Sequence, residues 1–222
     1  MEEPREHPPR AGTVTKLTVQ KNNPDRVSVF IDGAFAFGVH QNLVLKHELH
    51  AGRVLTAEEQ QAIQEEDRVA KAKARALEYL AYKPRTVAEV RRKLQEKEYE
   101  APVIDAVVEE FRERGYLDDV QYAEEYVRSR FSAKGYGPVR IEQELRKRGV
   151  DRPLAETAVE DFFAETDERA AAREHAEKGW SRIGREDDPR KRRDKLYRYL
   201  TRRGYTYDVV REVIDEMEAR RG

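Results

Sequence analysis

Hydrophobic residues are spaced differently in the two parts of the chain, and the first part has the spacing of strands. Val14–Val19, Val27–Ile31 and Phe35–Val39 each alternate apolar with polar residues. Asp32 and Gly33 join the second run to the third, and an Asp-Gly pair favours the positive φ angles of a type I′ hairpin turn. The pattern predicts a small antiparallel meander that must pack on the helices that follow it.

Helical spacing begins directly after these runs and continues to the end of the chain. His40–Lys46 and Thr56–Gln64 are predicted to form short helices, the second of which opens with a Thr56/Glu59 capping box. From about Glu66 onward every apolar run has a period near 3.6 residues. The larger part of the protein is therefore expected to be α-helical.

Seven apolar positions recur three times in this helical part, first at an offset of 51 residues and then at 55. The three sets are Val90, Leu94, Tyr99, Val103, Val107, Val108 and Phe111; Ile141, Leu145, Val150, Leu154, Ala158, Val159 and Phe162; and Leu196, Leu200, Tyr205, Val209, Val213, Ile214 and Met217. One further position holds Glu98, Gly149 and Gly204 in turn, as expected where a helix ends. We interpret the apolar positions as core.

Each repeat is predicted to contain three short helices. The first helices are Val69–Tyr82, Asp119–Ser132 and Asp167–Ile183, and later starts are marked by Thr86 with Glu89, Pro138, Pro153 and Thr206. The expected fold is mainly α, with tandem three-helix repeats in an elongated array and a small N-terminal antiparallel β meander. The expected organisation is a disordered tail over 1–12, the meander with short helices over 13–65, and repeats over 66–117, 118–164 and 165–222.

Composition narrows the class of protein. Of 222 residues 39% are charged, against roughly 25% in an average domain, which favours small helical units with much surface. There is no cysteine, so disulfides and thiolate metal sites are excluded. No apolar run reaches the length of a membrane span, and the first residues lack the layout of a secretion signal. We expect a cytoplasmic monomer that does not contact membranes.

The net charge of −1 hides a division of charge between helices. The middle helices are basic: residues 85–97 carry five basic and two acidic residues, 138–149 four and two, and 189–205 eight and one. The third helices are acidic, with seven carboxylates and one arginine over 151–168 and five and one over 206–218. The last two repeats are therefore predicted to be polarised.

This polarity bears on nucleic-acid binding. A three-helix unit suggests a helix-turn-helix, but phosphates would repel its acidic third helix. The basic middle helices could instead bind a polyanion, with Tyr136, Tyr197, Tyr199 and Tyr205 as stacking platforms. The alternative is that the charge runs are solvated faces stabilised by i,i+4 pairs.

Catalysis has little support in the sequence. His40, His47 and His50 with Glu48 suggest a metal site only faintly, because the histidine spacing is not that of a zinc helix. No phosphate-binding glycine loop and no nucleophile elbow occurs. We expect a non-enzyme with no cofactor and no metal.

One stretch of the chain resembles a known family. Gly115-Tyr116-Leu117-Asp118-Asp119-Val120-Gln121-Tyr122-Ala123 and Lys134-Gly135-Tyr136-Gly137-Pro138, followed by Ile141, Glu144, Leu145, Gly149 and Val150, are similar to the signature of the RecX family, the bacterial regulators of the RecA recombinase. The resemblance is closest over Ala74–Phe163. It implies a helical protein that lodges in the groove of the RecA nucleoprotein filament and inhibits its ATPase and strand exchange, in recombination and the SOS response of DNA repair. Glu98 departs from the glycine expected there.

The residues predicted to bind a partner are therefore positively charged. The residues expected to bind the RecA filament or DNA are Arg91, Arg92, Lys93, Arg140, Arg146, Lys147, Arg148, Arg192, Arg193, Lys195, Arg198, Arg202 and Arg203. Tyr116, Tyr122 and Tyr136 come with the family signature and are expected to be partly core. The alternative function is a stand-alone module whose basic middle helices bind single- or double-stranded DNA.

Overall fold

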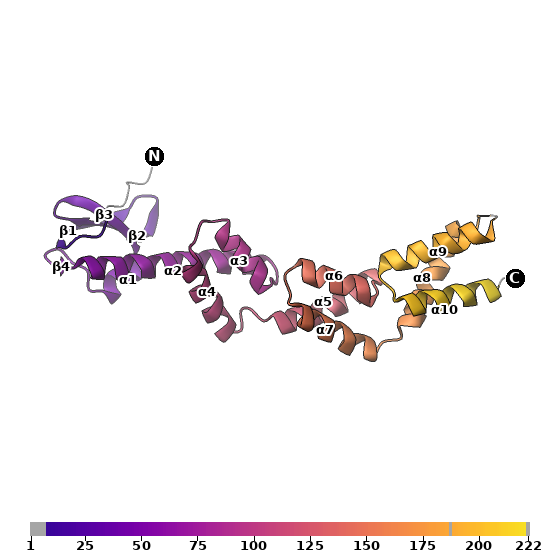
Figure 1. The fold of residues 1–222 in the computed structure, drawn as a ribbon. Helices are drawn as coiled ribbons and strands as arrows, with labels where there is room; N and C mark the ends of the chain where they lie inside the picture. The colour runs from indigo at the N-terminus through magenta and orange to yellow at the C-terminus, as the bar shows by residue number, and fades with distance from the viewer. Residues whose placement is uncertain (1–7, 187, 221–222) are drawn as a thin grey trace. The chain divides into compact units, whose positions relative to one another are not determined.

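The computed structural model describes residues 8–186 and 188–220 (Figure 1). The chain forms two compact units: unit 1 comprises Met1–Tyr79 and Leu94–Glu109, and unit 2 comprises Leu80–Lys93 and Glu110–Gly222. The disordered tail expected over residues 1–12 lies largely outside the described residues, and Gly12 already begins the first strand.

Unit 1 contains a four-stranded antiparallel sheet with the order β3-β2-β1-β4. Its strands are β1 (Gly12–Gln20), β2 (Asn23–Ile31), β3 (Ala34–His40) and β4 (Val54–Leu55). The three predicted runs are confirmed as β1 to β3, and Asp32 and Gly33 have φ angles of 51° and 85°, as the predicted turn requires. The sheet also contains β4, which the sequence did not predict. Its two residues are too few to show an alternating pattern.

The helix beside this sheet corrects the sequence prediction. The chain forms α1 (Gln41–Lys46) and then one continuous 26-residue helix, α2 (Ala57–Tyr82), where two separate helices were expected. Residues 65–68 contain neither glycine nor proline, so nothing in the backbone interrupts the helix there. The capping box is confirmed, because Thr56 Oγ1 accepts from Glu59 N (3.1 Å) and Glu59 Oε2 accepts from Thr56 N (2.8 Å).

A buried carboxylate joins α2 to the sheet. Asp67 is 3% exposed and accepts hydrogen bonds from Arg26 Nη2 (2.9 Å) and His40 N (2.9 Å). Burial alone would raise the pKa of Asp67, but the bond from Arg26 and the charges of Lys71 and Arg26 outweigh it and hold the pKa below its usual value. The meander therefore packs on the following helix, as expected, and Ile63 of α2 joins the core of the sheet.

The rest of the chain is helical, in the three-helix pattern that the sequence predicts. Repeat 1 consists of the C-terminal half of α2 with α3 and α4, repeat 2 of α5 to α7, and repeat 3 of α8 to α10. These helices are α3 (Val87–Gln95), α4 (Ala101–Glu113), α5 (Asp119–Lys134), α6 (Pro138–Lys147), α7 (Arg152–Ala164), α8 (Glu168–Ile183), α9 (Pro189–Arg203) and α10 (Tyr207–Ala219). The mainly α fold with a small N-terminal sheet is thus confirmed.

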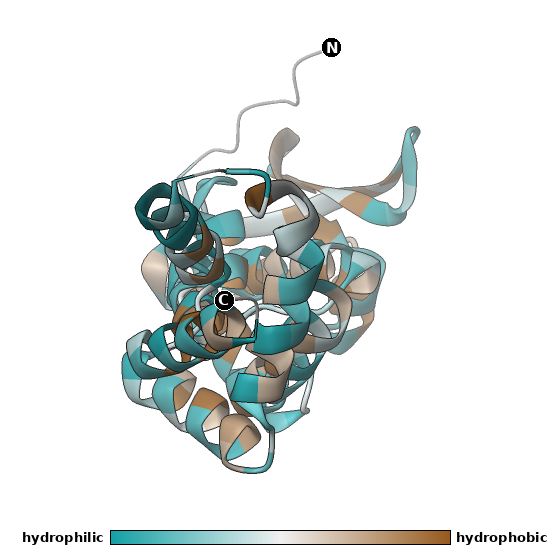
Figure 2. Ribbon diagram, turned by 90° about the vertical axis from the view of Figure 1, so that its right-hand side faces the viewer, coloured by the Kyte–Doolittle hydropathy of each residue, from teal (hydrophilic) through white to brown (hydrophobic). Residues whose placement is uncertain are grey.

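The recurring apolar positions form the cores of the repeats. In repeat 2, Ile141 and Leu145 of α6 cluster with Ala158 and Val159 of α7. In repeat 3, the equivalent residues of α9 and α10 form a second cluster. Figure 2 shows short hydrophobic segments between longer hydrophilic ones along the helices, as expected of helices that bury one narrow face.

After each middle helix, one residue has a left-handed backbone conformation, and this holds in all three repeats. Glu98, Gly149 and Gly204 have φ angles of 61°, 85° and 87°. Glu98 is exposed, and its backbone adopts the same conformation at a cost of roughly 1 kcal/mol. The helix ends predicted from this column are therefore confirmed.

The middle helices of successive repeats meet end to end within unit 2. In the α3–α6 junction, the Thr86 hydroxyl before α3 donates to Arg148 O at the end of α6 (2.7 Å). In the α6–α9 junction, Gly137 N before α6 donates to Arg203 O at the end of α9 (2.8 Å). These residues are related by the offsets of 51 and 55, so equivalent positions meet at both junctions.

Candidate functional site

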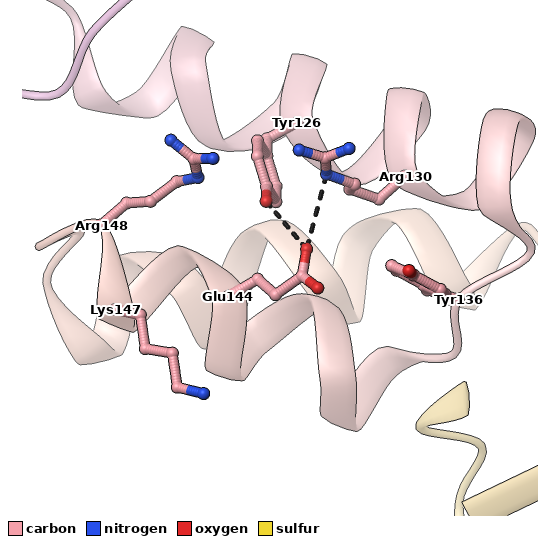
Figure 3. Close-up of a pocket in the computed structure, with 6 residues that line it drawn as sticks. All are labelled: Tyr126, Arg130, Tyr136, Glu144, Lys147 and Arg148. Carbon is pink, nitrogen blue, oxygen red and sulfur yellow. Dashed lines mark hydrogen bonds and ion pairs between the residues drawn. The ribbon is translucent and has the colours of Figure 1, made fainter. Parts of the chain in front are cut away.

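A row of aromatic and basic side chains follows helix α5 in repeat 2. The rings of Tyr122 and Tyr126, one turn apart, stack with their centres 5.9 Å apart and their planes 19° apart. The guanidinium groups of Arg130 and Arg148 lie 4.6 and 5.1 Å from the centre of the Tyr126 ring. Figure 3 shows Tyr126 between these two arginines, which is the arrangement of a cation–π interaction.

Two adjoining hollows of about 360 and 280 Å³ share Tyr126, Arg130 and Arg148. We call them together the tyrosine–arginine groove. Its lining residues are Lys83, Pro84, Tyr122, Glu125, Tyr126, Ser129, Arg130, Tyr136, Glu144, Lys147 and Arg148.

One carboxylate at the floor of this groove faces several cations. Glu144 accepts hydrogen bonds from the Tyr126 hydroxyl (2.8 Å) and Arg140 Nε (3.1 Å), and Arg130 Nε lies 3.5 Å away (Figure 3). Burial alone would raise the pKa of Glu144, but these bonds and the two arginine charges hold it below its usual value. Glu144 therefore stays ionised, and with Lys147 and Arg148 on the same walls the groove keeps an excess of positive charge.

The groove combines a neutral phenol with cations and aromatic rings. Burial raises the pKa of the Tyr122 hydroxyl, in spite of the nearby charge of Arg148, so this phenol stays neutral. Over residues 8–186 and 188–220, no three side chains that could ligate a metal lie together. His40 caps α1 and His47 pairs with Glu66. Cations and aromatic faces suit an anionic or aromatic ligand.

The predicted binding cations of α6 have unequal roles. Arg148 pairs with Glu89 of α3 (3.0 Å), and Arg146 pairs with Glu142 within its own helix (3.5 Å). Arg140 lies over the Tyr136 ring (3.7 Å) and donates to Arg202 O (3.0 Å). Lys147 is exposed on the groove wall. Three of these four are thus held by contacts within the protein.

The predicted cations of α9 divide into two faces. Arg193 pairs with Asp215 (2.7 Å) and Glu218 (2.6 Å) of α10, and Arg192 lies over the Trp180 ring. Arg203 donates to Lys134 O (2.8 Å) across the α6–α9 junction. The remaining three, Lys195, Arg198 and Arg202, are exposed on the outer face.

The predicted cations of α3 lie on its surface side. Arg92 is exposed, and Arg91 and Lys93 are half-buried. The structure does not bring the α3, α6 and α9 sets into one cluster. They remain candidate contacts on separate helices.

The polarisation of repeat 3 is smaller than the sequence suggests, because α10 neutralises part of α9. Arg193 of α9 is paired with α10, and Arg173 of α8 pairs with Glu216 of α10 (3.1 Å). Helices that pack around one core lie side by side, so basic side chains at the edge of one helix meet acidic side chains at the edge of its neighbour. One proposed stacking platform is also corrected: Tyr205 is only 3% exposed, and its hydroxyl donates to Gly135 O (3.0 Å).

The sequence interpretation missed Tyr126, Arg130 and Lys83 of the groove. Tyr122, Tyr126 and Arg130 follow each other at i, i+4 and i+8, which places them on one helix face. That spacing was the available signal. Of the signature tyrosines, Tyr122 and Tyr136 are half-buried, and Tyr116 is 52% exposed.

Fold and site together define a class of protein: a tandem three-helix repeat protein with an N-terminal sheet and a groove lined by basic and aromatic side chains. None of the helices in the described part of the chain is long and apolar enough to cross a membrane. Family models match the chain as the regulatory protein RecX N-terminal domain over residues 12–56 and as the first, second and third three-helix domains of RecX over 72–111, 118–159 and 166–214.

The chain belongs to the RecX family. It is 35% identical to the regulatory protein RecX of Clostridium acetobutylicum over 92% of this chain and 96% of that protein, and 32% identical to that of Bacillus subtilis over 92% and 77%. A crystal structure of regulatory protein RecX matches with a TM-score of 0.73 and 28% identity over 92% of this chain and 99% of that chain. RecX from Lactobacillus salivarius matches with a TM-score of 0.62 and 30% identity over 69% and 98%. These relatives are named as regulatory proteins, not as enzymes.

Proposed function

We propose that this chain regulates the RecA recombinase by binding the RecA nucleoprotein filament and inhibiting its ATPase and strand exchange. In the bacterial cytoplasm this would limit recombination and the SOS response of DNA repair. The proposal is supported by membership of the RecX family over all three repeats and the N-terminal sheet.

The observation that carries the proposal furthest is the repeated docking of middle helices. The α3–α6 and α6–α9 junctions join equivalent residues, so successive middle helices are linked at matching positions. A filament presents the same surface at a fixed interval, and a chain of repeated units can contact it more than once. Several weak contacts on one chain then add up through effective concentration, without any single strong site.

The contacts that we assign to this role are exposed cations near the groove of repeat 2 and on α3. Lys147 lies on the groove wall and Arg92 is exposed at the end of α3. Neither has an ion-pair partner among the described residues, so each is available for an acidic partner surface. Such pairs contribute to specificity and to the association rate more than to affinity.

The test is RecA ATP hydrolysis on single-stranded DNA, measured while the protein is added up to one molecule per RecA. We expect the rate of hydrolysis to fall as the protein approaches this ratio. An unchanged rate at stoichiometric protein would overturn the proposal.

A charge-reversal variant tests the assigned contacts. Arg92→Glu with Lys147→Glu should require at least about tenfold more protein for the same inhibition, because two attractive contacts become repulsive. The matched control is Arg152→Glu with Lys178→Glu, which changes the charge equally at two exposed positions on α7 and α8. Equal loss in both variants would mean that only net charge matters.

The alternative of a stand-alone DNA-binding module makes a different prediction. It requires tight binding to bare DNA at physiological salt and no effect that depends on RecA. Titrating the protein against RecA filaments and against naked DNA in parallel separates the two functions.

A further inference from the structure

The side chains of the tyrosine–arginine groove are not required by the core of repeat 2. The first helices of repeats 2 and 3 bury equivalent residues, Ala123 and Val127 in α5 and Ala172 and Ala176 in α8. Both pairs are related by the same offset, from 123 to 172 and from 127 to 176. This offset therefore aligns the two helices.

The aligned helices differ at the positions that form the groove. The groove residues of α5 and their counterparts in α8 are Tyr122 and Ala171, Tyr126 and His175, and Arg130 and Gly179. Repeat 3 builds its three-helix core without two tyrosines and a cation at these positions. The groove of repeat 2 is therefore an addition to the shared fold.

The larger hollow of the groove, of about 360 Å³, concentrates positive charge. Arg130, Lys147 and Arg148 line it together with one carboxylate, that of Glu144 (Figure 3). Glu144 already accepts a hydrogen bond from the Tyr126 hydroxyl (2.8 Å). Arg130 Nε is buried and makes no hydrogen bond in the described part of the chain. The hollow thus has more cations than its own carboxylate can satisfy.

Both arginines of this hollow are held in place by the protein. Arg148 pairs with Glu89 (3.0 Å), and both guanidinium groups lie against the ring of Tyr126. The side chains of Arg130 and Arg148 are 30% and 28% exposed, so each presents part of its guanidinium group to solvent. Cations fixed in this way lose little conformational entropy when an anion binds.

The smaller hollow, of about 280 Å³, suits a flat aromatic ring. Tyr122 and Pro84 contribute apolar surface to its lining, and Ser129 and Glu125 contribute a hydroxyl and a carboxylate. Nucleic-acid bases stack on aromatic side chains, and a few polar groups in a mainly apolar site fix the orientation of a ligand. This hollow therefore has the groups that one base needs.

The two hollows share Tyr126, Arg130 and Arg148, so one ligand can occupy both. Such a ligand has an aromatic ring at one end and several negative charges at the other. We propose that the tyrosine–arginine groove binds a free nucleoside 5′-triphosphate. The base lies in the smaller hollow beside Tyr122, and the phosphates lie in the larger hollow beside Arg130 and Arg148.

The clustering of the cations favours a free nucleotide over a nucleic acid. A DNA strand carries one negative charge per nucleotide, about 3.4 Å apart along each strand of a duplex. A 5′-triphosphate instead carries all its phosphates at one end of a single nucleotide. Three cations around one small hollow match this compact charge, and arginine binds phosphate oxygens through paired hydrogen bonds.

This nucleotide site goes beyond the proposed regulation of RecA, because the chain would bind the nucleotide without RecA. It also differs from the alternative of a DNA-binding module, which uses the basic middle helices and needs a polymer.

The experiment is isothermal titration calorimetry of the full chain with ATP, AMP and inorganic tripolyphosphate, in a buffer without magnesium. ATP should bind at least about tenfold more tightly than AMP, because AMP has too few charges for the cations of the larger hollow. ATP should also bind more tightly than tripolyphosphate, because only ATP has a base that can stack. Equal affinity for ATP and AMP, or no binding of ATP at millimolar concentration, would overturn the proposal.

Two variants test the two hollows separately. Tyr122→Leu should weaken the binding of ATP about tenfold and leave that of tripolyphosphate unchanged, because only the stacking surface is lost. Arg130→Gln should weaken the binding of both ligands about tenfold, because a phosphate contact is lost. Far-UV circular dichroism and thermal unfolding check that each variant folds.

The matched controls are Tyr207→Leu, at a tyrosine of α10 that is 62% exposed, and Arg128→Gln, at an exposed arginine of α5. Both controls should bind ATP as the parent chain does. Equal losses in the groove variants and their controls would mean that no specific site exists.

Competition with single-stranded oligothymidylate distinguishes a free nucleotide from a nucleic acid. At an equal concentration of phosphate, the oligonucleotide should not displace ATP. If it displaced ATP and itself bound more weakly to Tyr122→Leu, the groove would be a nucleic-acid site and the proposal would be wrong. The regulation of RecA is measured in a separate assay, so it would stand even if the groove bound no nucleotide.

Discussion

The two junctions between middle helices join equivalent positions but differ in the groups that bridge them. At the α3–α6 junction the bridging groups are the Thr86 hydroxyl and an ion pair between Glu89 and Arg148. At the α6–α9 junction they are Gly137 N and two arginines, Arg140 and Arg203, that donate to carbonyl oxygens of the opposite repeat. The close approach of backbones is therefore what the repeat requires, while the charges beside it can change.

The largest expected effect is the loss of stability when the glycine at a junction, Gly204 or Gly149, is replaced by alanine. A Cβ at Gly204 would lie 2.4 Å from Arg140 N, and at Gly149 it would lie 2.3 Å from Ala88 Cβ. Backbone cannot move aside, and both positions have positive φ, so Gly204→Ala should lower the free energy of unfolding by about 3 kcal/mol. Gly149→Ala should be partly rescued by Ala88→Gly. Urea unfolding followed by the fluorescence of Trp180 measures both.

A complete rescue at Gly149 is not expected, because about 1 kcal/mol of left-handed strain would remain. The control is Gly33→Ala, at a turn of unit 1 where φ is also positive but nothing lies within 4 Å of the added Cβ. If Gly204→Ala cost no more than this control, close approach would not be the reason for the glycine.

An effect of intermediate size is expected from the ion pair of the α3–α6 junction. The side chains of Glu89 and Arg148 are only 12% and 28% exposed. Glu89→Gln and Arg148→Gln should each destabilise the chain, with a coupling of about 1 kcal/mol in a double-mutant cycle. Arg203→Gln at the equivalent position of the other junction leaves no carboxylate unpaired and should cost less. Coupling near zero would show that the pair does not hold the junction.

The smallest effect concerns pH at the α6–α9 junction. His175 of α8 lies against Gly135, and burial together with the charges of Arg203 and Lys178 lowers its pKa below the ordinary 6.5. The unfolded chain therefore binds a proton first, so stability should fall as the pH drops below about 6.5 toward the folded pKa, and should be constant above it. His175→Gln should flatten this dependence in thermal unfolding between pH 7.5 and 5.5. An unchanged slope in that variant would assign the dependence to other groups.

Much of the fold followed from the sequence because it depends on local spacing. The apolar positions led by Ile141 and Leu196 marked the helices of repeats 2 and 3, and Asp32-Gly33 marked its turn. The break expected between Gln64 and Val69 was wrong, because a charged segment without glycine or proline can stay helical when a tertiary contact, here from Arg26 to Asp67, satisfies it. The strand β4 was missed, because its two residues have meaning only beside β1.

The candidate site followed from the sequence only in part. The basic helices were found by counting charge, but counting could not tell Arg193, which pairs with Asp215, from Arg198, which faces solvent. The groove around Tyr126 needed residues of α5 and α6 to be brought together. Its only trace in the sequence was the spacing of Tyr122, Tyr126 and Arg130.

The sequence by itself determined the number of repeats, the core positions, the ends of the middle helices and the helix that carries the most positive charge. These features depend on residue type and on separations of a few residues. In a helix such short separations decide which side chains share one face, and the residue type decides where the helix ends. Only the tertiary structure decided which cations are used within the protein and which remain for a partner. An ion pair such as that of Glu89 and Arg148 joins residues 59 positions apart, and no local pattern fixes such a distance.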